Sequence, residues 1–497
     1  MKAWQIEIAP QEEAAVRMTK EVLDLFSVQT VPANDVADFA KLSIVHEVCR
    51  QQPVTVKTTL SLWPIAGGRQ FFCEMGEAMP YELPKAAWHR LLKRNLYRLL
   101  RRNFSLPPAP WGILHGVRPL KIVHHWLDEE PNLSAEMIAQ RLQVDYEVSV
   151  SKATAMTQIA FLQRPFMAQT TPKTISVYVG IPFCLSRCLY CSFPAYVLPL
   201  EEQLKSFFQA WNKDLQAVQV AIAHYGLQVQ SVYVGGGTPT SLDDEHFRQM
   251  LRTVKHAFIT TATREFTVEA GRPDSLNATK AEIMQELGVT RVSLNPQTMQ
   301  ARTLRYIGRK HTPADILCRF AELRRLGSFA INMDVILGLP GETCADVADT
   351  MRQVLALKPD DVTLHALALK RGSRLKEHLA AHPLPSDEET RAMFTVAQQQ
   401  IEAAGLRPYY LYRQGYMRGQ LENIGCALPG KESWYNIQIM GERQTILGVG
   451  CGATSKIVEV QGTRLKASFQ PKDLLVYIRE IDAHIQKRAA LLQEVYG

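Results

Sequence analysis

The chain of 497 residues lacks the features of a membrane or secreted protein. It contains no run of about eighteen apolar residues, the length that a membrane-spanning helix needs. Its first residues, Met-Lys-Ala-Trp-Gln-Ile-Glu-Ile, have no apolar secretory core. Its nine cysteines are scattered apart from one group of three, which fits a reducing compartment. We therefore expect a cytoplasmic protein without a membrane span.

The composition is that of an ordinary globular protein. Hydrophobic residues make up 46 % of the chain and charged residues 21 %. The length allows about two to four domains. The net charge of +7 is mild. It permits nucleic acid as a partner and suits a polycarboxylate substrate equally well, so charge alone decides neither.

The most informative stretch is a loop with three closely spaced cysteines. An alternating apolar run over 175–181 predicts a buried strand, whose hydrogen-bond ladder ends at Pro182. The loop then carries Cys184, Cys188 and Cys191. Thiolates at this spacing can hold one metal cluster, and iron–sulfur clusters are usually held by four cysteines. With no obvious fourth cysteine one iron stays open, which suits a reaction better than electron transfer.

Three other interpretations of these cysteines are weaker. A structural zinc site needs four ligands, and no fourth Cys or His lies nearby in the sequence. The three cysteines could also be unrelated buried residues. A disulfide would need an oxidising compartment, which nothing in the sequence indicates.

Residues 1–170 are expected to form an N-terminal α+β accessory domain that ends near a polar linker at 169–174. Apolar spacing predicts helices over 12–26, 85–103 and 134–142, the last capped by Ser134, and strands over 55–60 and 70–73. Cations surround the apolar stripe of the second helix: Arg90, Lys93, Arg94, Arg98, Arg101 and Arg102. They can form an RNA or phosphate patch, or a dock for an acidic electron donor. A solvated helix face is the more ordinary explanation, and nucleic acid is not the expected partner.

Residues 171–375 alternate between strand and helix patterns, which predicts a parallel βα array. The strands are expected at 175–181, 231–235, 266–270, 291–295, 330–337 and 361–367. The helices are expected at 201–224, 243–258, 279–287, 313–326 and 343–356. Residues 376–497 change character, with a long helix over 387–404 and an amphipathic helix after Pro471. We interpret them as a mainly helical C-terminal lid domain that contributes to substrate binding.

Polar residues stand at the ends of successive predicted strands. The second strand ends in Gly-Gly-Gly-Thr-Pro-Thr at 235–240, where glycine permits close backbone approach. Glu269 ends the third strand and Asp334 lies inside the fifth, and a carboxylate in an apolar strand costs several kcal/mol unless it is paired. Each acid alone would commonly satisfy a neighbouring backbone or Arg. Several polar groups at neighbouring strand ends instead predict one ligand site.

These motifs resemble the radical S-adenosylmethionine (SAM) superfamily. The Cys-x3-Cys-x2-Cys loop after a strand carries the resemblance, and the GGGTPT turn narrows it to the coproporphyrinogen dehydrogenase and haem chaperone branch. The strings PWGILHGVRP, FTVEAGRPD and PYYLYRQ are similar to the HemZ-type oxygen-independent coproporphyrinogen III dehydrogenases. The resemblance implies a partial (β/α)6 barrel, a 4Fe–4S cluster with an open iron on Cys184, Cys188 and Cys191, and one or two SAM molecules.

The resemblance also implies roles for single residues. Tyr178 would border SAM, and Tyr190 would contact the adenine through its backbone. The other implied SAM contacts are Gly236, Gly237 and Thr238 at the amino end, Glu269, Gln297, Arg309 and Asp334 around the carboxylate, the ribose and a second SAM, and Ala366 after strand six. No residue is assigned as a catalytic acid or base. The chain departs from the better-known dehydrogenases at Phe193, where they have a fourth cysteine, and at Gly180, where they have histidine.

The leading hypothesis is an enzyme that converts propionates of coproporphyrinogen III to vinyl groups, giving protoporphyrinogen IX in haem synthesis. The resemblance implies an electron donor such as flavodoxin or ferredoxin. A tetra-anionic substrate needs cations, for which the candidates are Arg407, Arg413, Arg418 and Lys431. A haem chaperone of the related branch is the first alternative, but its C-terminal Gly-Pro-Gly-Ala-His reads Gly-Cys-Gly-Ala-Thr here, without histidine. A porphyrin-acting radical methylase is the second.

Overall fold

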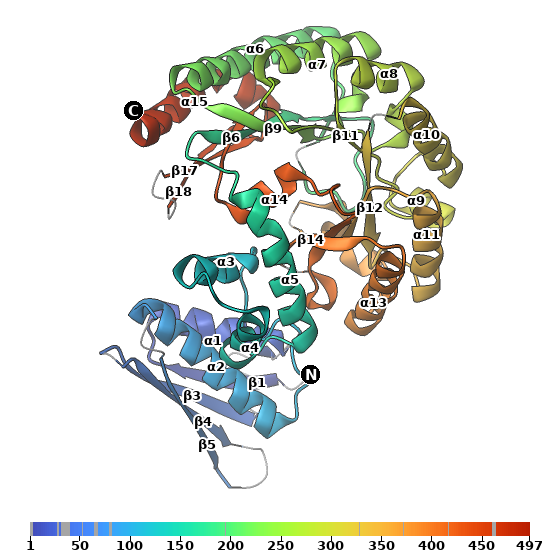
Figure 1. Cartoon of the computed structure of the whole chain (residues 1–497). Coiled ribbons are helices and arrows are strands. Elements are labelled where there is room, and N and C mark those ends of the chain that lie inside the picture. Colours follow the sequence, from blue (N-terminus) through green and yellow to red (C-terminus); the bar gives the residue numbers. More distant parts are fainter. Residues whose placement is uncertain are drawn as a thin grey trace. The chain divides into compact units, whose positions relative to one another are not determined.

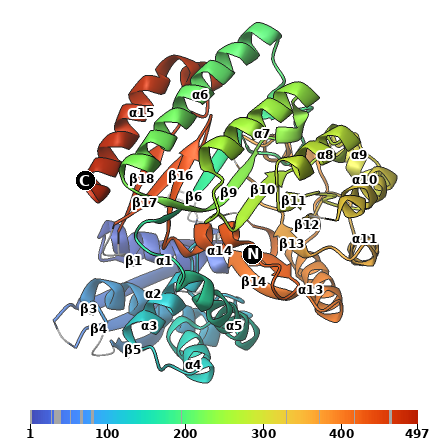
Figure 2. The ribbon, with the colours of Figure 1, turned by 45° about the horizontal axis from the view of Figure 1, so that its top comes forward.

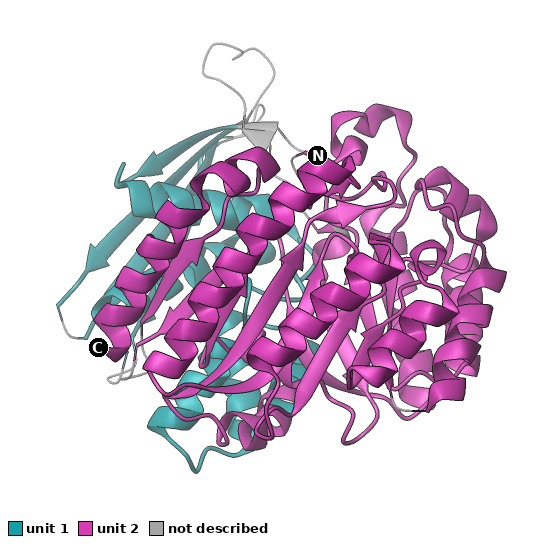
Figure 3. Ribbon diagram, turned by 90° about the horizontal axis from the view of Figure 1, so that it is seen from above, with its two compact units in different colours: residues 1–158 teal, residues 159–497 magenta. Residues whose placement is uncertain are grey.

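A computed structural model describes most of the chain. The described residues are 3–26, 29–30, 40–51, 53–63, 68–78, 82–193, 195–327, 329–370, 372–415, 417–459 and 464–497. They fall into two units, Met1–Gln158 and Ile159–Gly497 (Figure 3). The expected domain boundaries at 170 and 375 stay a prediction. Within the described ranges, no helix combines the length and the apolar character that crossing a membrane would require.

A five-stranded sheet forms the first unit, in the order β2-β1-β3-β4-β5. Strand β1 is parallel to β2 and β3, whereas β3, β4 and β5 are successively antiparallel. The strands are β1 (Ala3–Ala9), β2 (Gln29–Thr30), β3 (Ala40–Cys49), β4 (Thr55–Trp63) and β5 (Gln70–Glu77). The two strands predicted in this region are confirmed as β4 and β5, and both run further than expected.

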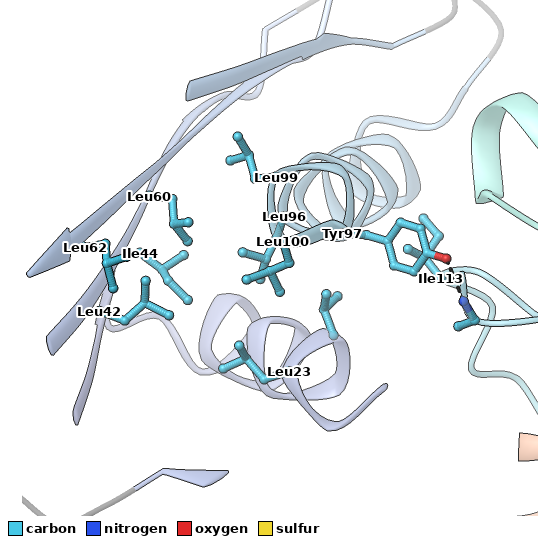
Figure 4. Packing of buried hydrophobic residues seen from close by; sticks show 12 residues of the cluster. Leu23, Leu42, Ile44, Leu60, Leu62, Leu96, Tyr97, Leu99, Leu100 and Ile113 are labelled. Carbon is cyan, nitrogen blue, oxygen red and sulfur yellow. Dashed lines mark hydrogen bonds between the residues drawn. The ribbon is translucent and has the colours of Figure 1, made fainter. Parts of the chain in front are cut away.

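The predicted helices of this region are also present. They are α1 (Glu13–Leu25), α2 (Pro84–Phe104) and α4 (Ala135–Tyr146). Two further helices, α3 (Leu120–Glu129) and α5 (Val150–Met167), were not predicted. Ser134 caps α4 as expected, since its side chain accepts a hydrogen bond from the Met137 amide at 3.3 Å. The leucine stripe of α2 packs on α1 and the sheet, with Leu96 and Leu100 buried against Leu60 (Figure 4).

The cations of α2 meet carboxylates of the same unit. Arg90 is buried and pairs with Glu82 at 2.5 Å and Asp145 at 3.3 Å. Further along the helix, Arg98 pairs with Glu147 at 2.6 Å. Other pairs are Lys93–Glu21, Arg94–Asp145 and Arg102–Glu74. Most of the positive charge is therefore balanced locally, which agrees with a packed and solvated helix and leaves little support for a nucleic-acid patch.

The second unit is built on an eleven-stranded sheet in the order β14-β15-β13-β12-β11-β10-β9-β6-β16-β17-β18. Its seven central strands, from β13 to β16, are parallel. Six of them follow one another in the chain: β6 (Thr174–Ile181), β9 (Gln228–Gly236), β10 (Glu265–Glu269), β11 (Arg291–Ser293), β12 (Ala330–Leu337) and β13 (Asp361–Ala366). The predicted parallel βα array is confirmed.

Helices connect these strands and lie along one side of the curved sheet (Figure 1). They are α6 (Glu201–His224), α7 (Asp244–Phe258), α8 (Ala278–Glu286), α9 (Ala301–Tyr306), α10 (Pro313–Leu326) and α11 (Cys344–Ala356). Five were predicted, and α9 was not. Thr312 and Thr343 begin α10 and α11 with capping boxes, in which Asp315 and Asp346 bond back to the cap. Such local signals explain why these boundaries could be predicted from sequence.

The C-terminal residues return to both ends of the same sheet. Strands β14 (Arg407–Tyr412) and β15 (Asn423–Ala427) extend it beyond β13, and β16 (Thr445–Val449), β17 (Thr454–Val458) and β18 (Leu465–Phe469) extend it beyond β6. The helices are α12 (Arg374–Glu377), α13 (Asp387–Ala403), α14 (Trp434–Gly441) and α15 (Leu474–Tyr496). Helix α15 lies beside α6 (Figures 1 and 2). The helical character expected here is confirmed, and five strands accompany it.

Candidate functional site

A cavity of about 350 Å³ lies in the second unit, where polar side chains meet at the carboxyl ends of the parallel strands. The side chains come from the cysteine loop, from β9 to β13 and from the C-terminal strands. The described lining residues include Tyr190, Cys191, Phe193, Tyr233, Glu269, Gln297, Asp334, His365, Ala366 and Lys370. The location agrees with the rule that ligands of parallel βα folds bind at this edge of the sheet.

The cysteine loop is held between two neighbouring strand ends. After β6 the chain forms the short strand β7 (Phe183–Cys184), which pairs with β8 (Tyr196–Val197). Cys184 Sγ lies 3.0 Å from Thr238 Oγ1 in the turn after β9. Cys188 is buried, and its Sγ lies 3.8 Å from a guanidinium nitrogen of Arg272. Backbone and side-chain contacts thus hold the loop from several directions.

The three thiols share one electrostatic environment. Burial raises the pKa of Cys184 and of Cys191, and the neighbouring cysteines raise both values further. Nearby guanidinium groups act in the opposite direction and favour thiolates: Arg272 lowers the pKa of Cys184, and Arg187 and Arg309 lower that of Cys191. The described residues include no group of three His, Cys, Asp or Glu side chains spaced for a single metal ion.

The glycine turn after β9 lies against the backbone of the cysteine loop. Gly236 has φ +113°, a conformation that L side chains rarely adopt. A Cβ atom on Gly237 would lie 2.4 Å from the Phe183 carbonyl oxygen. The amides of Gly237 and Thr238 donate to the carbonyls of Ile181 and Phe183 at 2.8 and 2.7 Å. Glycine is therefore required for this turn to reach the loop.

Glu269 lines the cavity at the end of β10. Its carboxylate accepts a hydrogen bond from Tyr233 Oη at 2.6 Å and another from the Gly236 amide at 3.2 Å. Burial raises its pKa to about 7, with a further contribution from Asp334, although the two donors oppose the shift. Glu269 is therefore near its titration midpoint at neutral pH and connects the glycine turn to the cavity.

Asp334 lines the same cavity from β12 and is held as an anion. Its Oδ1 accepts from Asn332 at 2.8 Å, and its Oδ2 lies 3.5 Å from His365 Nε2. Burial raises its pKa, but the hydrogen bond and charge of His365, with bonds from Asn332 and Thr363, outweigh this and lower the pKa overall. The carboxyl groups on β10 and β12, two strands that β11 separates in the sheet, thus have pKa values shifted in opposite directions.

Gln297 supplies an unused acceptor. The residue has φ +65°, and its backbone bonds to β12 on both sides. Its side-chain Oε1 is buried, and no described residue donates to it. A buried acceptor without a donor is unfavourable, so this atom indicates a ligand that donates hydrogen bonds in the cavity. Gln297 is the clearest sign of an absent ligand.

Arg309 supports the site from behind the lining. Its Nη1 donates to the carbonyls of Gly271 and Asn295 at 3.0 and 2.7 Å. Burial lowers its pKa, but Tyr190 and Cys188 beside it outweigh the effect, so the pKa is raised overall. The guanidinium therefore remains charged close to the cysteine loop.

The structure brings most of the predicted site residues together. Tyr190, Glu269, Gln297, Asp334, Ala366 and Cys191 line the cavity. Six other predicted residues belong to the cysteine loop or lie close to it, and they are not among the described residues that line the cavity: Cys184, Cys188, Gly236, Gly237, Thr238 and Arg309. Tyr178 also lies outside the lining, and its ring stacks on Tyr233 with centroids 6.2 Å apart.

The sequence analysis missed Tyr233, Arg272, His365 and Lys370. Tyr233 stands two residues before Gly235 on β9, so strand alternation places both on one face and could have identified it. His365 faces Asp334 because β12 and β13 pair in a register that no local pattern reveals. The residues beside Lys370 in the sequence form no motif that would have identified it as part of a binding site.

The predicted cations lie elsewhere. Arg407 and Lys431 are exposed and Arg413 is largely buried, with its pKa lowered to about 10 by burial. None of the three is among the described residues that line the cavity. The side chain of the fourth candidate, Arg418, lies outside the described residues. That these cations bind the substrate stays a prediction.

A parallel βα sheet with a three-cysteine loop after one strand and a glycine turn after the next defines a radical SAM protein. The model of the radical SAM superfamily matches residues 178–354. The oxygen-independent coproporphyrinogen-III oxidase-like protein HemZ of Bacillus subtilis (strain 168) is 34 % identical over 390 residues, which cover 78 % of this chain and 77 % of that protein. The chain belongs to this HemZ-type family within the radical SAM superfamily.

Other relatives share the central region. The heme chaperone HemW of Bacillus subtilis is 30 % identical over 56 % of this chain and 70 % of its own. The HemW of Escherichia coli (strain K12) is 28 % identical over 59 % of this chain and 73 % of its own. The structure of coproporphyrinogen III oxidase (HemN) from Escherichia coli aligns with a TM-score of 0.51 at 23 % identity, covering 66 % of this chain and 73 % of that one. The expected radical SAM fold is confirmed.

Proteins of this superfamily bind a 4Fe–4S cluster and SAM, and the residues present fit both groups. Three thiols beside guanidinium groups are a suitable donor set for an iron–sulfur cluster. The free acceptor of Gln297 and the carboxyl group of Glu269 suit a ligand with hydroxyl and ammonium donors. The predicted cofactors are therefore confirmed at the level of the superfamily.

Proposed function

We propose that this protein is an oxygen-independent coproporphyrinogen III dehydrogenase, which oxidatively decarboxylates two propionate side chains to vinyl groups. The observation that supports this most is the extent of the match to the HemZ protein. It covers 78 % of the chain, whereas the HemW match from the same organism covers 56 %. A shared accessory region beyond the barrel favours the activity suggested by the HemZ name over that of the HemW relatives.

The proposal gives the described residues specific roles in binding. Cys184, Cys188 and Cys191 would hold the cluster, and Arg187, Arg272 and Arg309 would offset its negative charge. When bound and reduced, the cluster and SAM would supply a 5′-deoxyadenosyl radical that removes a hydrogen atom from a propionate, which then loses CO2 and passes one electron to an external acceptor to leave a vinyl group. The protein's task is then to position its ligands and to keep water and oxygen away from them.

The cavity residues would position SAM. The turn at Gly236, Gly237 and Thr238 would hold the amino end, together with the carboxylate of Glu269. Gln297 would accept a hydrogen bond from the ligand, and Asp334 would act with His365 as a second polar contact. Tyr178 would border the ligand through Tyr233, Tyr190 would contact the adenine, and Ala366 would close the floor.

One anaerobic assay tests the proposal. Protein with a reconstituted cluster is incubated with SAM, a reductant and coproporphyrinogen III, and the products are separated after oxidation of the macrocycle. We expect 5′-deoxyadenosine and protoporphyrinogen IX, with the monovinyl product as an intermediate. Cleavage of SAM without any vinyl product would reject the substrate assignment. The Cys188→Ala protein is the control for chemistry that the cluster does not support.

A haem chaperone is the second candidate, because the HemW proteins match the barrel region at 28–30 % identity. Phe193 fits this reading, since it stands in the cavity where the dehydrogenase branch would place another cysteine. Stoichiometric retention of haem by the purified protein, without decarboxylation, would favour the chaperone over the enzyme.

The proposed cofactor also bears on the compartment and on the electron donor of the enzyme. None of the nine cysteines takes part in a disulfide, which supports a reducing compartment such as the cytoplasm. The cluster needs an external one-electron donor, and a flavodoxin or a ferredoxin would serve. Reduction of the cluster by either protein, followed spectroscopically in an anaerobic mixture, is the direct test.

A further inference from the structure

Among the described residues that line the cavity, Lys370 is the one lysine, and no arginine accompanies it. It follows β13, beside the cysteine loop, whereas the two acids of the lining stand on β10 and β12. Its ammonium nitrogen lies 5.8 Å from the ring centroid of Phe193, which also lines the cavity. The positive charge of the cavity is thus concentrated on the side of the cysteine loop.

No acid of the described chain balances this charge. Lys370 is half-buried, and none of the described carboxylates lies within ion-pair distance of it. Glu269 bonds to Tyr233 and Gly236 instead, and Asp334 pairs with His365. A partly buried ammonium without an anion is unfavourable, so the site is more stable when a ligand supplies one.

The cysteine loop does not require this lysine. Burial lowers the pKa of Lys370, and the Cys191 thiol opposes the shift, so the two groups are close. The largest contributions that lower the pKa of Cys191 come from the Phe193 amide, Arg187 and Arg309. Two guanidinium groups already favour negative charge at that sulfur, which leaves the ammonium of Lys370 available to the cavity.

Apolar surface flanks the charge. The cavity lining also includes the apolar residues Ile336, Leu367 and Met440, and Phe193 keeps 58 % of its surface exposed. A single ammonium beside an apolar wall suits a carboxylate on a hydrophobic body.

We propose that Lys370 binds a carboxylate of the substrate and thereby selects carboxylated tetrapyrroles. The inference rests on the proposed function only in taking that carboxylate to be a propionate of a porphyrin. It assigns to Lys370 a role for which Arg407, Arg413 and Lys431 are not positioned in this cavity, because they are not among its described lining residues. Phe193 then provides the apolar surface on which part of the macrocycle rests.

Equilibrium binding tests the proposal without relying on turnover. Cluster-loaded protein is titrated anaerobically with coproporphyrin III, the oxidised form of the substrate, and with its uncharged tetramethyl ester, both followed by fluorescence. The variants are Lys370→Met, Lys370→Arg and the control Lys376→Met, which changes an exposed lysine outside the cavity lining. SAM binding and the reduction potential of the cluster are measured on the same samples.

We expect Lys370→Met to bind the tetra-acid about ten- to a hundredfold more weakly, because one charge-assisted hydrogen bond is lost. Its affinity for the ester should stay unchanged, Lys370→Arg should recover part of the loss, and Lys376→Met should match the wild type. Equal losses for acid and ester would overturn the proposal, since they would indicate packing. So would wild-type affinity for the acid, or a defect confined to SAM binding or to the reduction potential.

Failure of the two proposals can be told apart. If the wild type forms no vinyl product, the proposed function fails, whatever the titrations show. If vinyl product forms but Lys370→Met binds the tetra-acid normally, the assignment of Lys370 alone fails.

Discussion

At the scale of single residues, burial and the surrounding hydrogen-bond partners together shift the pKa values of the acids of this chain. Glu269 and Glu342 each have a pKa raised to about 7 by desolvation, whereas the pKa of Asp334 is lowered by His365. Glu269 lines the cavity, but Glu342 does not. Desolvation therefore raises the pKa of Glu269 inside the cavity and of Glu342 outside its lining. Mutagenesis of each residue can separate the two effects.

The cysteines give a prediction about cofactor content. If the three thiols hold the cluster, Cys188→Ala should lose most of its iron and sulfide after reconstitution, and reductive cleavage of SAM should disappear. Cys318→Ala, at an exposed cysteine outside the loop, should keep both. Iron and sulfide analysis with electron paramagnetic resonance measures the outcome. A folded Cys188→Ala protein with a full cluster would contradict the ligand assignment.

Glu342 gives a prediction about pH. Its side chain is 5 % exposed and accepts a hydrogen bond from Thr298 at 2.6 Å. Because its pKa is raised on folding, the folded state keeps a proton that the unfolded state has lost between about pH 4.3 and pH 7. The free energy of unfolding should therefore fall as pH rises through this window, by about 1–3 kcal/mol from this residue. Glu342→Gln cannot titrate, so its stability should depend less on pH.

Denaturant unfolding at several pH values measures this dependence, with Glu282→Gln as the control at an exposed glutamate. An unchanged slope in Glu342→Gln would show that Glu342 does not carry a raised pKa.

At the scale of elements, the parallel strands and most of their helices were predictable, because alternation, capping residues and glycines are local signals. The capping boxes at Thr312 and Thr343 are examples. The strands β16 to β18 were not predicted. Each is only five residues long, and β16 becomes a strand by pairing with β6, which lies far away in the sequence. The alternating apolar residues of β6 indicate a strand, but they do not identify β16 as its neighbour.

The same limit applied to the site. Glu269 and Asp334 were conspicuous because they interrupt apolar strands. Lys370 and His365 are defined only once β12 and β13 are placed side by side, so no local pattern in the sequence could identify them. Arg407 and Arg413 were chosen for their charge alone, and charge does not determine which way a strand end points.

A buried ion pair joins α6 to α15 and gives a prediction at this scale. Arg488 Nη2 lies 2.6 Å from Asp214 Oδ1, with the side chains 2 % and 0 % exposed. Asp214 also accepts from Tyr477 and from the Gly450 amide. Arg488→Met should lower the free energy of unfolding by about 3–5 kcal/mol, because it leaves a buried carboxylate without its cation.

The same two helices offer the control. Lys213 and Asp482 form an exposed pair at 3.1 Å, with side chains 58 % and 71 % exposed. Lys213→Met should cost less than about 1 kcal/mol. Chemical denaturation compares the variants, and equal losses would mean that burial does not distinguish the pairs.

At the scale of the whole molecule, the chain consists of two units, each with its own core. Leu96→Ala removes a fully buried side chain from the core of the first unit and should cost that unit about 2–5 kcal/mol. Leu323→Ala makes the same change in α10 of the second unit. Each variant should shift mainly the thermal transition of its own unit, and the loss of cluster absorbance should follow Leu323→Ala only. A single transition shifted equally by both would indicate one cooperative unit.

Strand β16 has a consequence for how the protein matures in the cell. The strand that leads into the cysteine loop, β6, is bordered by β9 on one side and by Thr445–Val449 on the other. During synthesis β6 leaves the ribosome well before β16, so it has an open edge until nearly the whole polypeptide has been made. Iron delivered earlier would reach a cysteine loop whose preceding strand, β6, still lacks its neighbour β16. We therefore expect cluster insertion to follow release of the finished chain.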